Sequence, residues 1–120
     1  MTYLTTEQDA EFDEYIKKWQ VILGLTDWRI ERGNKRGGKD AMAQVTSKVG
    51  ARLAIYKTGY WGDQVPDSES IEATALHELL HVFLVDFAHA VKTSDNDLTL
   101  ESAEHAIVNR LEKLLLKVPR

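Results

Sequence analysis

A chain of 120 residues, 43% of them hydrophobic, suits one domain, 1–120, with a hydrophobic core of its own. The net charge of -4 disfavours a nucleic-acid partner, which usually meets a basic face, and the lack of cysteine excludes disulfides and thiolate metal sites. No secretory signal opens the sequence and no apolar stretch is long enough for a membrane span, so we expect a cytoplasmic protein without a membrane partner.

The first half of the chain predicts one helix followed by strands. Thr5 and Gln8 are spaced as a capping box, apolar residues then recur at helical spacing, and Gly24 closes this helix. Beyond it, apolar and polar residues alternate in short runs, which is typical of strands. Three strands are expected, at 28–32, 43–48 and 51–57.

The second half of the chain predicts two helices. Asp67 or Ser68 caps a long helix that runs to about Val91. From 79 to 91 this helix is apolar nearly all round, which is typical of a buried central helix. The last helix is expected at about 99–117. A helix, three strands and two further helices in this order predict a small α+β domain.

The segment His77-Glu78-Leu79-Leu80-His81 lies inside the long helix. Histidines four residues apart on a helix share one face and can bind one ion, and Glu78 beside them can take a proton from water at that ion. Zinc fits best, because it prefers histidine and carboxylate ligands and its catalytic sites hold three protein ligands. The alternative, a metal-free pair of core or capping histidines, would bury polar groups without partners, at a cost in free energy.

A third ligand is expected on the last helix, where Glu104, Glu101 and His105 compete. The predicted apolar seam of this helix consists of Leu100, Ile107, Leu111, Leu114 and Val118. Glu104 falls within the seam, where a carboxylate needs a strong partner such as a cation, so Glu104 is favoured. Glu101 lies nearer the rim and could accept a hydrogen bond from a ligand histidine. His105 points about 100° away from Glu104.

The motif, together with a downstream glutamate, resembles the zinc helix of the zincin metallopeptidases in their gluzincin form. The metzincin subgroup is excluded, because Leu84 and Phe87 stand where it has a glycine and a third histidine. The chain is similar to the minimal gluzincin-like domains of phage and prophage genomes, and more distantly to the ImmA/IrrE-type metallopeptidases. The resemblance implies a zincin-like fold, a phage or prophage origin and a glutamate as the third zinc ligand.

We therefore expect a zinc-dependent peptidase that acts on a peptide or protein. One zinc ion per chain is expected on His77, His81 and Glu104, with Glu78 as general base and acid. An edge strand, 51–57, is expected to hold the peptide by strand addition. Two alternatives remain open: a zinc-stabilised binding module without peptidase activity, and a hydrolase of another amide or ester. Glu78 favours an enzyme, because a purely structural metal site needs no general base.

Overall fold

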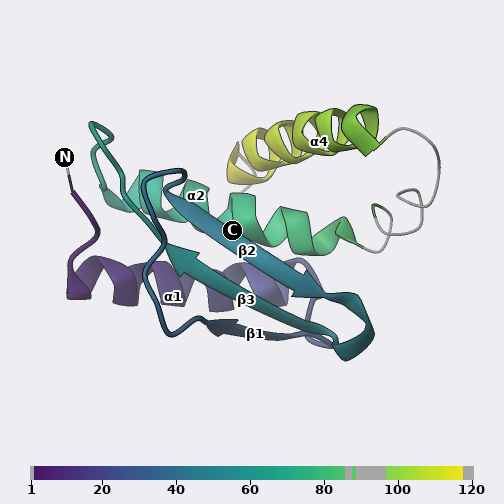
Figure 1. The fold of residues 1–120 in the computed structure, drawn as a ribbon, viewed down its shortest axis with the longest axis horizontal. Coiled ribbons are helices and arrows are strands. Elements are labelled where there is room, and N and C mark those ends of the chain that lie inside the picture. The colour runs from purple at the N-terminus through teal and green to yellow at the C-terminus, as the bar shows by residue number, and fades with distance from the viewer. Residues whose placement is uncertain (1, 86–87, 89–96, 118–120) are drawn as a thin grey trace.

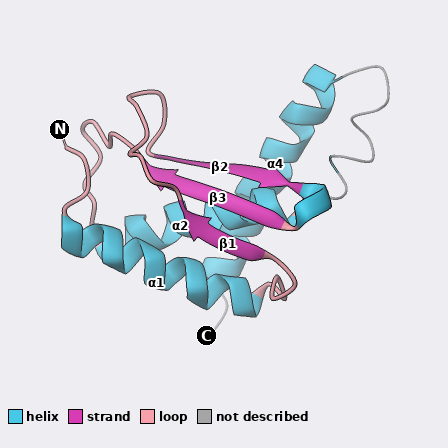
Figure 2. Ribbon diagram, turned by 60° about the horizontal axis from the view of Figure 1, so that its bottom comes forward, coloured by secondary structure: helices cyan, strands magenta, loops and turns pink. Residues whose placement is uncertain are grey.

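The computed structural model describes residues 2–85, 88 and 97–117, with 97–103 described by their backbone. Its elements, in chain order, are α1 (Thr6–Ile22), β1 (Arg29–Arg32), β2 (Ala43–Lys48), the 3-10 helix η1 (Val49–Ala51), β3 (Leu53–Thr58), α2 (Ser68–Phe83) and α4 (Asp97–Lys117). Figure 1 shows α2 between α1 and α4, and the sheet lies against the helices (Figure 1, Figure 2). The predicted α+β class is confirmed.

The start of α1 lies where the sequence predicts it, whereas the end of α2 does not. At the start of α1 the capping box is present: the Thr5 hydroxyl accepts from the Gln8 N–H, and the Gln8 side chain accepts from the Thr5 N–H. The prediction that the long helix runs to about Val91 is wrong, because α2 ends at Phe83, and Leu84 caps it. No glycine or proline marks this end, and the apolar run continues past it.

β3 is the central strand of the three-stranded sheet, whose order is β1-β3-β2. β1 pairs with β3 in parallel, and β2 pairs with it antiparallel, with Val45 opposite Tyr56. Along β3, Ala54, Tyr56 and Thr58 are buried, and the residues between them are half-buried on the open face. The expectation that 51–57 forms an edge strand is therefore wrong. In the described part of the chain, the two edges are β1 and β2.

The interior lies where α1 and α2 pack on each other and on the sheet. Its largest fully buried apolar side chains are Phe12, Trp19, Trp61, Ile71, Leu76, Leu79, Leu80, Val82 and Val108. The buried carboxylate of Glu72 accepts hydrogen bonds from Trp19 Nε1 at 2.8 Å and from Lys18 Nζ at 2.7 Å. Because Glu72 belongs to α2 and both donors belong to α1, these bonds join the two helices.

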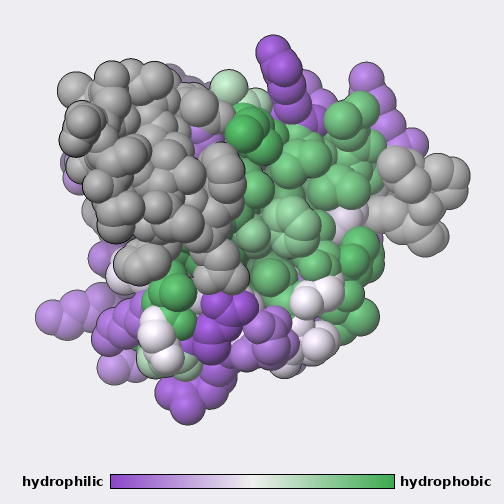
Figure 3. Space-filling view, turned by 90° about the vertical axis from the view of Figure 1, so that its right-hand side faces the viewer, coloured by the Kyte–Doolittle hydropathy of each residue, from purple (hydrophilic) through white to green (hydrophobic). Residues whose placement is uncertain are grey.

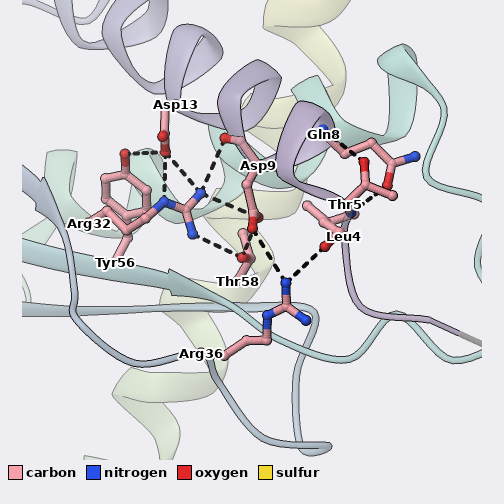
Figure 4. A network of polar contacts seen from close by, with 9 residues as sticks. All are labelled: Leu4, Thr5, Gln8, Asp9, Asp13, Arg32, Arg36, Tyr56 and Thr58. Carbon is pink, nitrogen blue, oxygen red and sulfur yellow. Dashed lines mark hydrogen bonds and ion pairs between the residues drawn. The ribbon is translucent and has the colours of Figure 1, made fainter.

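A network of polar contacts fastens α1 to the sheet (Figure 4). Arg32 donates from Nε to Asp13 at 2.9 Å and from Nη1 to the Thr58 hydroxyl at 3.0 Å. The Tyr56 hydroxyl also donates to Asp13, at 2.7 Å, and the Thr58 hydroxyl donates to Asp9 at 2.7 Å. Burial, followed by the hydrogen bond to Asp13, raises the pKa of Tyr56. The network satisfies polar groups that would otherwise be costly to bury beside the core.

Apolar side chains also reach the surface at one end of the molecule. The C-terminal ends of α1 and α2 lie on the same side in Figure 1, and Figure 3 shows apolar side chains gathered on that face. Val21, Ile22 and Phe83 are the exposed large hydrophobic residues at these two helix ends. Among the helices described, none is long and apolar enough to cross a membrane.

Candidate metal centre

The helices α2 and α4 run in opposite directions and bring six chemically active side chains together. Figure 1 shows the opposite directions of the two helices. Along α2, His77 precedes His81; along α4, Glu104, which contacts His81, precedes Glu112, which contacts His77. Antiparallel packing thus places both histidines of the motif on the side of α2 that faces α4. The core side of α2 is held by its buried apolar residues, among them Leu76, Leu79 and Leu80.

Three histidines converge at this helix pair: His77 and His81 from α2, and His105 from α4. One ring nitrogen of each lies within 4.8 Å of one ring nitrogen of both others. The ring centroids are 5.1 Å apart for His77 and His81, 4.8 Å for His81 and His105, and 6.3 Å for His77 and His105. Two nitrogens on one tetrahedral zinc ion lie roughly 3.3 Å apart, so small side-chain rotations would bring all three onto one ion.

Each histidine of the motif has a carboxylate of α4 at its Nδ1 nitrogen. His77 Nδ1 lies 2.9 Å from Glu112 Oε1, and His81 Nδ1 lies 2.7 Å from Glu104 Oε2. An ionised carboxylate only accepts hydrogen bonds, so a neutral histidine ring at either contact would carry its proton on Nδ1. The other nitrogen, Nε2, then keeps its lone pair for an ion. A carboxylate at the outer nitrogen is the usual partner of a metal-binding histidine.

Glu104 lies at the site, but the contact it makes there is not the one expected of a third metal ligand. The structure brings it to the site as a hydrogen-bond partner of His81, while the group whose ligand atoms converge is His77, His81 and His105. Whether Glu104 binds a metal stays a prediction. The Glu101 side chain lies outside the described residues, so its predicted role also remains a prediction.

The predicted seam of the last helix is rotated in the structure. Val108 is fully buried, whereas Ile107 and Leu114 are 39% and 62% exposed. The four nearest neighbours of Val108 on a helix face are 104, 105, 111 and 112, so both His105 and Glu112 come to the side of α2. Leu111 and Leu115 pack on the core and complete this face. Leu100 and Val118, the ends of the predicted seam, lie outside the residues whose side chains are described.

Glu78 is the acidic group of the site that is most deeply placed, with 8% of its surface exposed. Burial raises its pKa to about 7, although the charge of His77 lowers it, and Glu112 adds a smaller increase. The hydrogen bond that His77 makes to Glu112 raises the pKa of His77, whereas burial lowers that of His81. A carboxyl group that titrates near neutrality can both accept and donate a proton under physiological conditions.

A groove runs past Glu78 between β2, α2 and α4. Its larger part, a cavity of about 720 Å³, is lined on the helix side by His77, Glu78, His81, Glu104 and His105. On the strand side the lining residues include Ala43, Val45 and Ser47. A second cavity of about 310 Å³ shares His77 and Glu78 with the first and extends to Thr74, Asn109 and Glu112. The two cavities therefore meet at the motif, along strand β2.

No protein-family model, no curated protein and no solved structure matches the chain. The resemblance to gluzincin-type zincins therefore stays a prediction that depends on the motif itself. The zincin-like fold and the phage or prophage origin, which that resemblance implies, stay predictions too. Function has to be inferred from the side chains that meet at α2 and α4.

Proposed function

We propose that the protein is a zinc-dependent peptidase whose metal is held by His77, His81 and His105. The observation that carries this proposal is the convergence of three imidazoles beside the buried carboxyl group of Glu78. Imidazole nitrogen is a preferred zinc donor, and three protein ligands are the usual number at a catalytic zinc ion. The three rings therefore fit the metal that the motif predicts.

We place His105, and not Glu104, third in this ligand set. Glu104 is engaged at 2.7 Å by the Nδ1 nitrogen of His81, where it orients that ring. His105 lies next to Glu104 in sequence and its ring is 4.8 Å from that of His81. Its exposed position at the wall of the larger cavity allows the ring to turn towards an ion without disturbing the core.

Glu78 supplies the acid–base chemistry in this proposal. A bound zinc ion supplies Lewis-acid activation of a water molecule and of the scissile carbonyl group. Glu78 lines both cavities, so its carboxylate can take a proton from the attacking water. It then gives that proton to the leaving amine, which completes the hydrolysis with Glu78 returned to its starting form.

The edge of β2, which no other described strand covers, favours an extended peptide as the substrate. The Met42 carbonyl accepts from the Gly59 N–H at 2.7 Å, so this residue directs its backbone groups towards β3. Antiparallel strands alternate in this respect, and Ala43, Val45 and Ser47 therefore direct their N–H and C=O groups away from β3. The same three residues line the larger cavity. A peptide paired with this edge would pass beside Glu78.

The test compares wild type with Glu78→Gln for zinc content and for cleavage of a peptide library. Wild type is expected to hold about one zinc ion per chain and to cleave peptides. Glu78→Gln should keep the zinc and lose at least about 100-fold in rate, because a positioned acid–base group contributes that much. Zinc binding without cleavage of any peptide would support the binding-module alternative. Cleavage confined to other amides or esters would support the alternative of a hydrolase that acts on such substrates. Failure to bind zinc would overturn the proposal.

A further inference from the structure

We infer that Glu112 is a positioning residue that holds His77 in the tautomer and orientation needed for metal binding. This inference rests on the proposed metal centre. Glu112 belongs to α4 and His77 to α2, 35 residues earlier, and the bond between Oε1 and Nδ1 is 2.9 Å long. The side chains are 23% and 27% exposed, so the bond is shielded from solvent along much of its surface.

The surroundings of Glu112 make His77 its natural partner. Both residues line the smaller cavity, and no lysine or arginine is among the described residues that line it. Glu112 follows Val108 by four residues, so the buried valine fixes the side of α4 from which the carboxylate extends. Core packing therefore sets the face of α4 on which Glu112 lies.

The chemical effect of Glu112 is to choose which nitrogen of His77 faces the metal. A neutral imidazole carries its proton on one nitrogen only, and a carboxylate at Nδ1 selects the form with the proton there. The Nε2 lone pair is then available and the ring is held against rotation. Without Glu112, His77 would exchange between tautomers and ring orientations, and each metal-binding event would have to select the right one.

Glu104 does the same for His81, so α4 holds the two rings from opposite ends. The carboxylates are eight residues apart on α4, about 12 Å along the axis, and the histidines are four residues apart on α2, about 6 Å. Each glutamate therefore contacts its histidine from the side that lies away from the other histidine. One ring nitrogen of each of these histidines lies within 4.8 Å of a ring nitrogen of His105.

The experiment combines two measurements on Glu112→Ala and Glu112→Gln. Nitrogen-15 NMR of the imidazoles in chelator-treated protein gives the tautomer of His77, and competition with a chromophoric chelator gives the affinity for zinc. Wild type should show the Nδ1–H form. Glu112→Ala should lose that preference and bind zinc about 10- to 100-fold more weakly, the usual effect of removing such a partner. Glu112→Gln should keep the tautomer, because its amide oxygen still accepts, and should lose less affinity.

Glu14→Gln is the matched control. It removes the same charge from an exposed position on α1, where Glu14 pairs with Lys17, and should leave both measurements unchanged. An Nε2–H form of His77 in wild type, or wild-type zinc affinity in Glu112→Ala, would overturn the inference and leave the metal centre standing. If wild type bound no zinc, the proposed centre would fail first and the inference with it. If Glu112→Ala does not fold, the near-isosteric Glu112→Gln decides: weaker zinc binding than in wild type supports the inference, and wild-type affinity would overturn it.

Discussion

His81 Nδ1 lies 2.7 Å from Glu104 Oε2, so a histidine of the motif is hydrogen-bonded to the residue directly before His105. Two neighbouring residues of α4 therefore lie near the His81 ring. Glu104 contacts its Nδ1 nitrogen, and the centroid of the His105 ring lies 4.8 Å from that of His81. A ligand and the partner of a ligand differ in how much metal affinity their removal costs. Replacing each in turn can separate the two roles.

We expect His105→Ala to lose more zinc affinity than Glu104→Gln. Removal of His105 takes away one of three ligands, whereas Glu104→Gln keeps an acceptor for His81 and should weaken binding by no more than about 100-fold. Zinc content after dialysis against a series of zinc buffers measures both. The opposite order, with zinc lost in Glu104→Gln and kept in His105→Ala, would make Glu104 the third ligand.

Removal of zinc should lower the melting temperature of the wild-type protein. A metal that binds only the folded chain stabilises it by about 4 kcal/mol when free zinc is 1,000 times the dissociation constant. Calorimetry with and without a chelator measures this shift. His81→Ala, which lacks one proposed ligand, should melt at the same temperature in both conditions. A chelator effect of equal size in wild type and His81→Ala would place the stabilising metal elsewhere.

The metal-free protein should lose stability as the pH rises from about 4.5 to about 7, because of Glu78. Burial raises the pKa of Glu78 from 4.5 to about 7. The folded state therefore holds this proton over a range in which the unfolded state has released it. Below about pH 4.5 this proton makes its full contribution to the free energy of unfolding, up to about 3 kcal/mol. The contribution is lost as the pH rises to the folded-state pKa of about 7.

Glu78→Gln isolates this contribution, because glutamine does not titrate. Urea unfolding of both proteins in chelator, at about pH 5 and about pH 8, gives the difference at each pH. Wild type should fall relative to the variant as the pH rises. The raised pKa of His77 acts in the same direction, and because the charge of Glu78 contributes to that rise, the variant loses part of it as well. The lowered pKa of His81 acts in the opposite direction and is common to both proteins. Parallel pH dependences would contradict the raised pKa of Glu78.

Gly59→Ala should destabilise the protein and disturb the groove. A Cβ atom at Gly59 would collide with the carbonyl oxygen of Ala41 and lie 2.8 Å from that of Gly38. Because both obstacles are backbone atoms, the segment must shift, at a cost of about 1–3 kcal/mol. Gly38→Ala is the control, since a Cβ there has no atom within 4 Å. Urea unfolding of the two variants compares them, and equal stability would show that the segment yields freely.

The sequence predicted those parts of the fold that local patterns specify. The Thr5–Gln8 capping box and the alternation of strand residues act over a few positions, so their physical causes are visible in the sequence. The order of the strands is not local: the parallel pairing of β1 with β3 puts β3 in the centre, and nothing in the 51–57 segment indicates that both its edges are covered. For that reason the edge strand was assigned wrongly.

The same distinction applies to the candidate site. Histidines four residues apart on one helix predict a shared face with no further information. To choose the third ligand on the last helix, one must know how that helix is rotated about its own axis. The sequence leaves this rotation open, because apolar residues stand side by side at Ile107 and Val108 and again at Leu114 and Leu115. Packing selects Val108 and Leu115, and that choice brings Glu112 to His77. The spacing of Glu112 four residues after Val108 is the signal that could have shown it.

The two carboxylate–histidine pairs span short stretches of chain, 23 residues for His81 and Glu104 and 35 for His77 and Glu112. The entropy lost on closing such loops is modest, and contacts between residues close in sequence form early in folding. The metal-binding groups thus belong to a helical hairpin that does not need the sheet for its own closure. The strand edge beside them belongs to a separate unit, the β2–β3 pair, from Ala43 opposite Thr58 to Lys48 opposite Leu53. Mutations that loosen the sheet should therefore impair the capture of substrate before they impair the capture of metal.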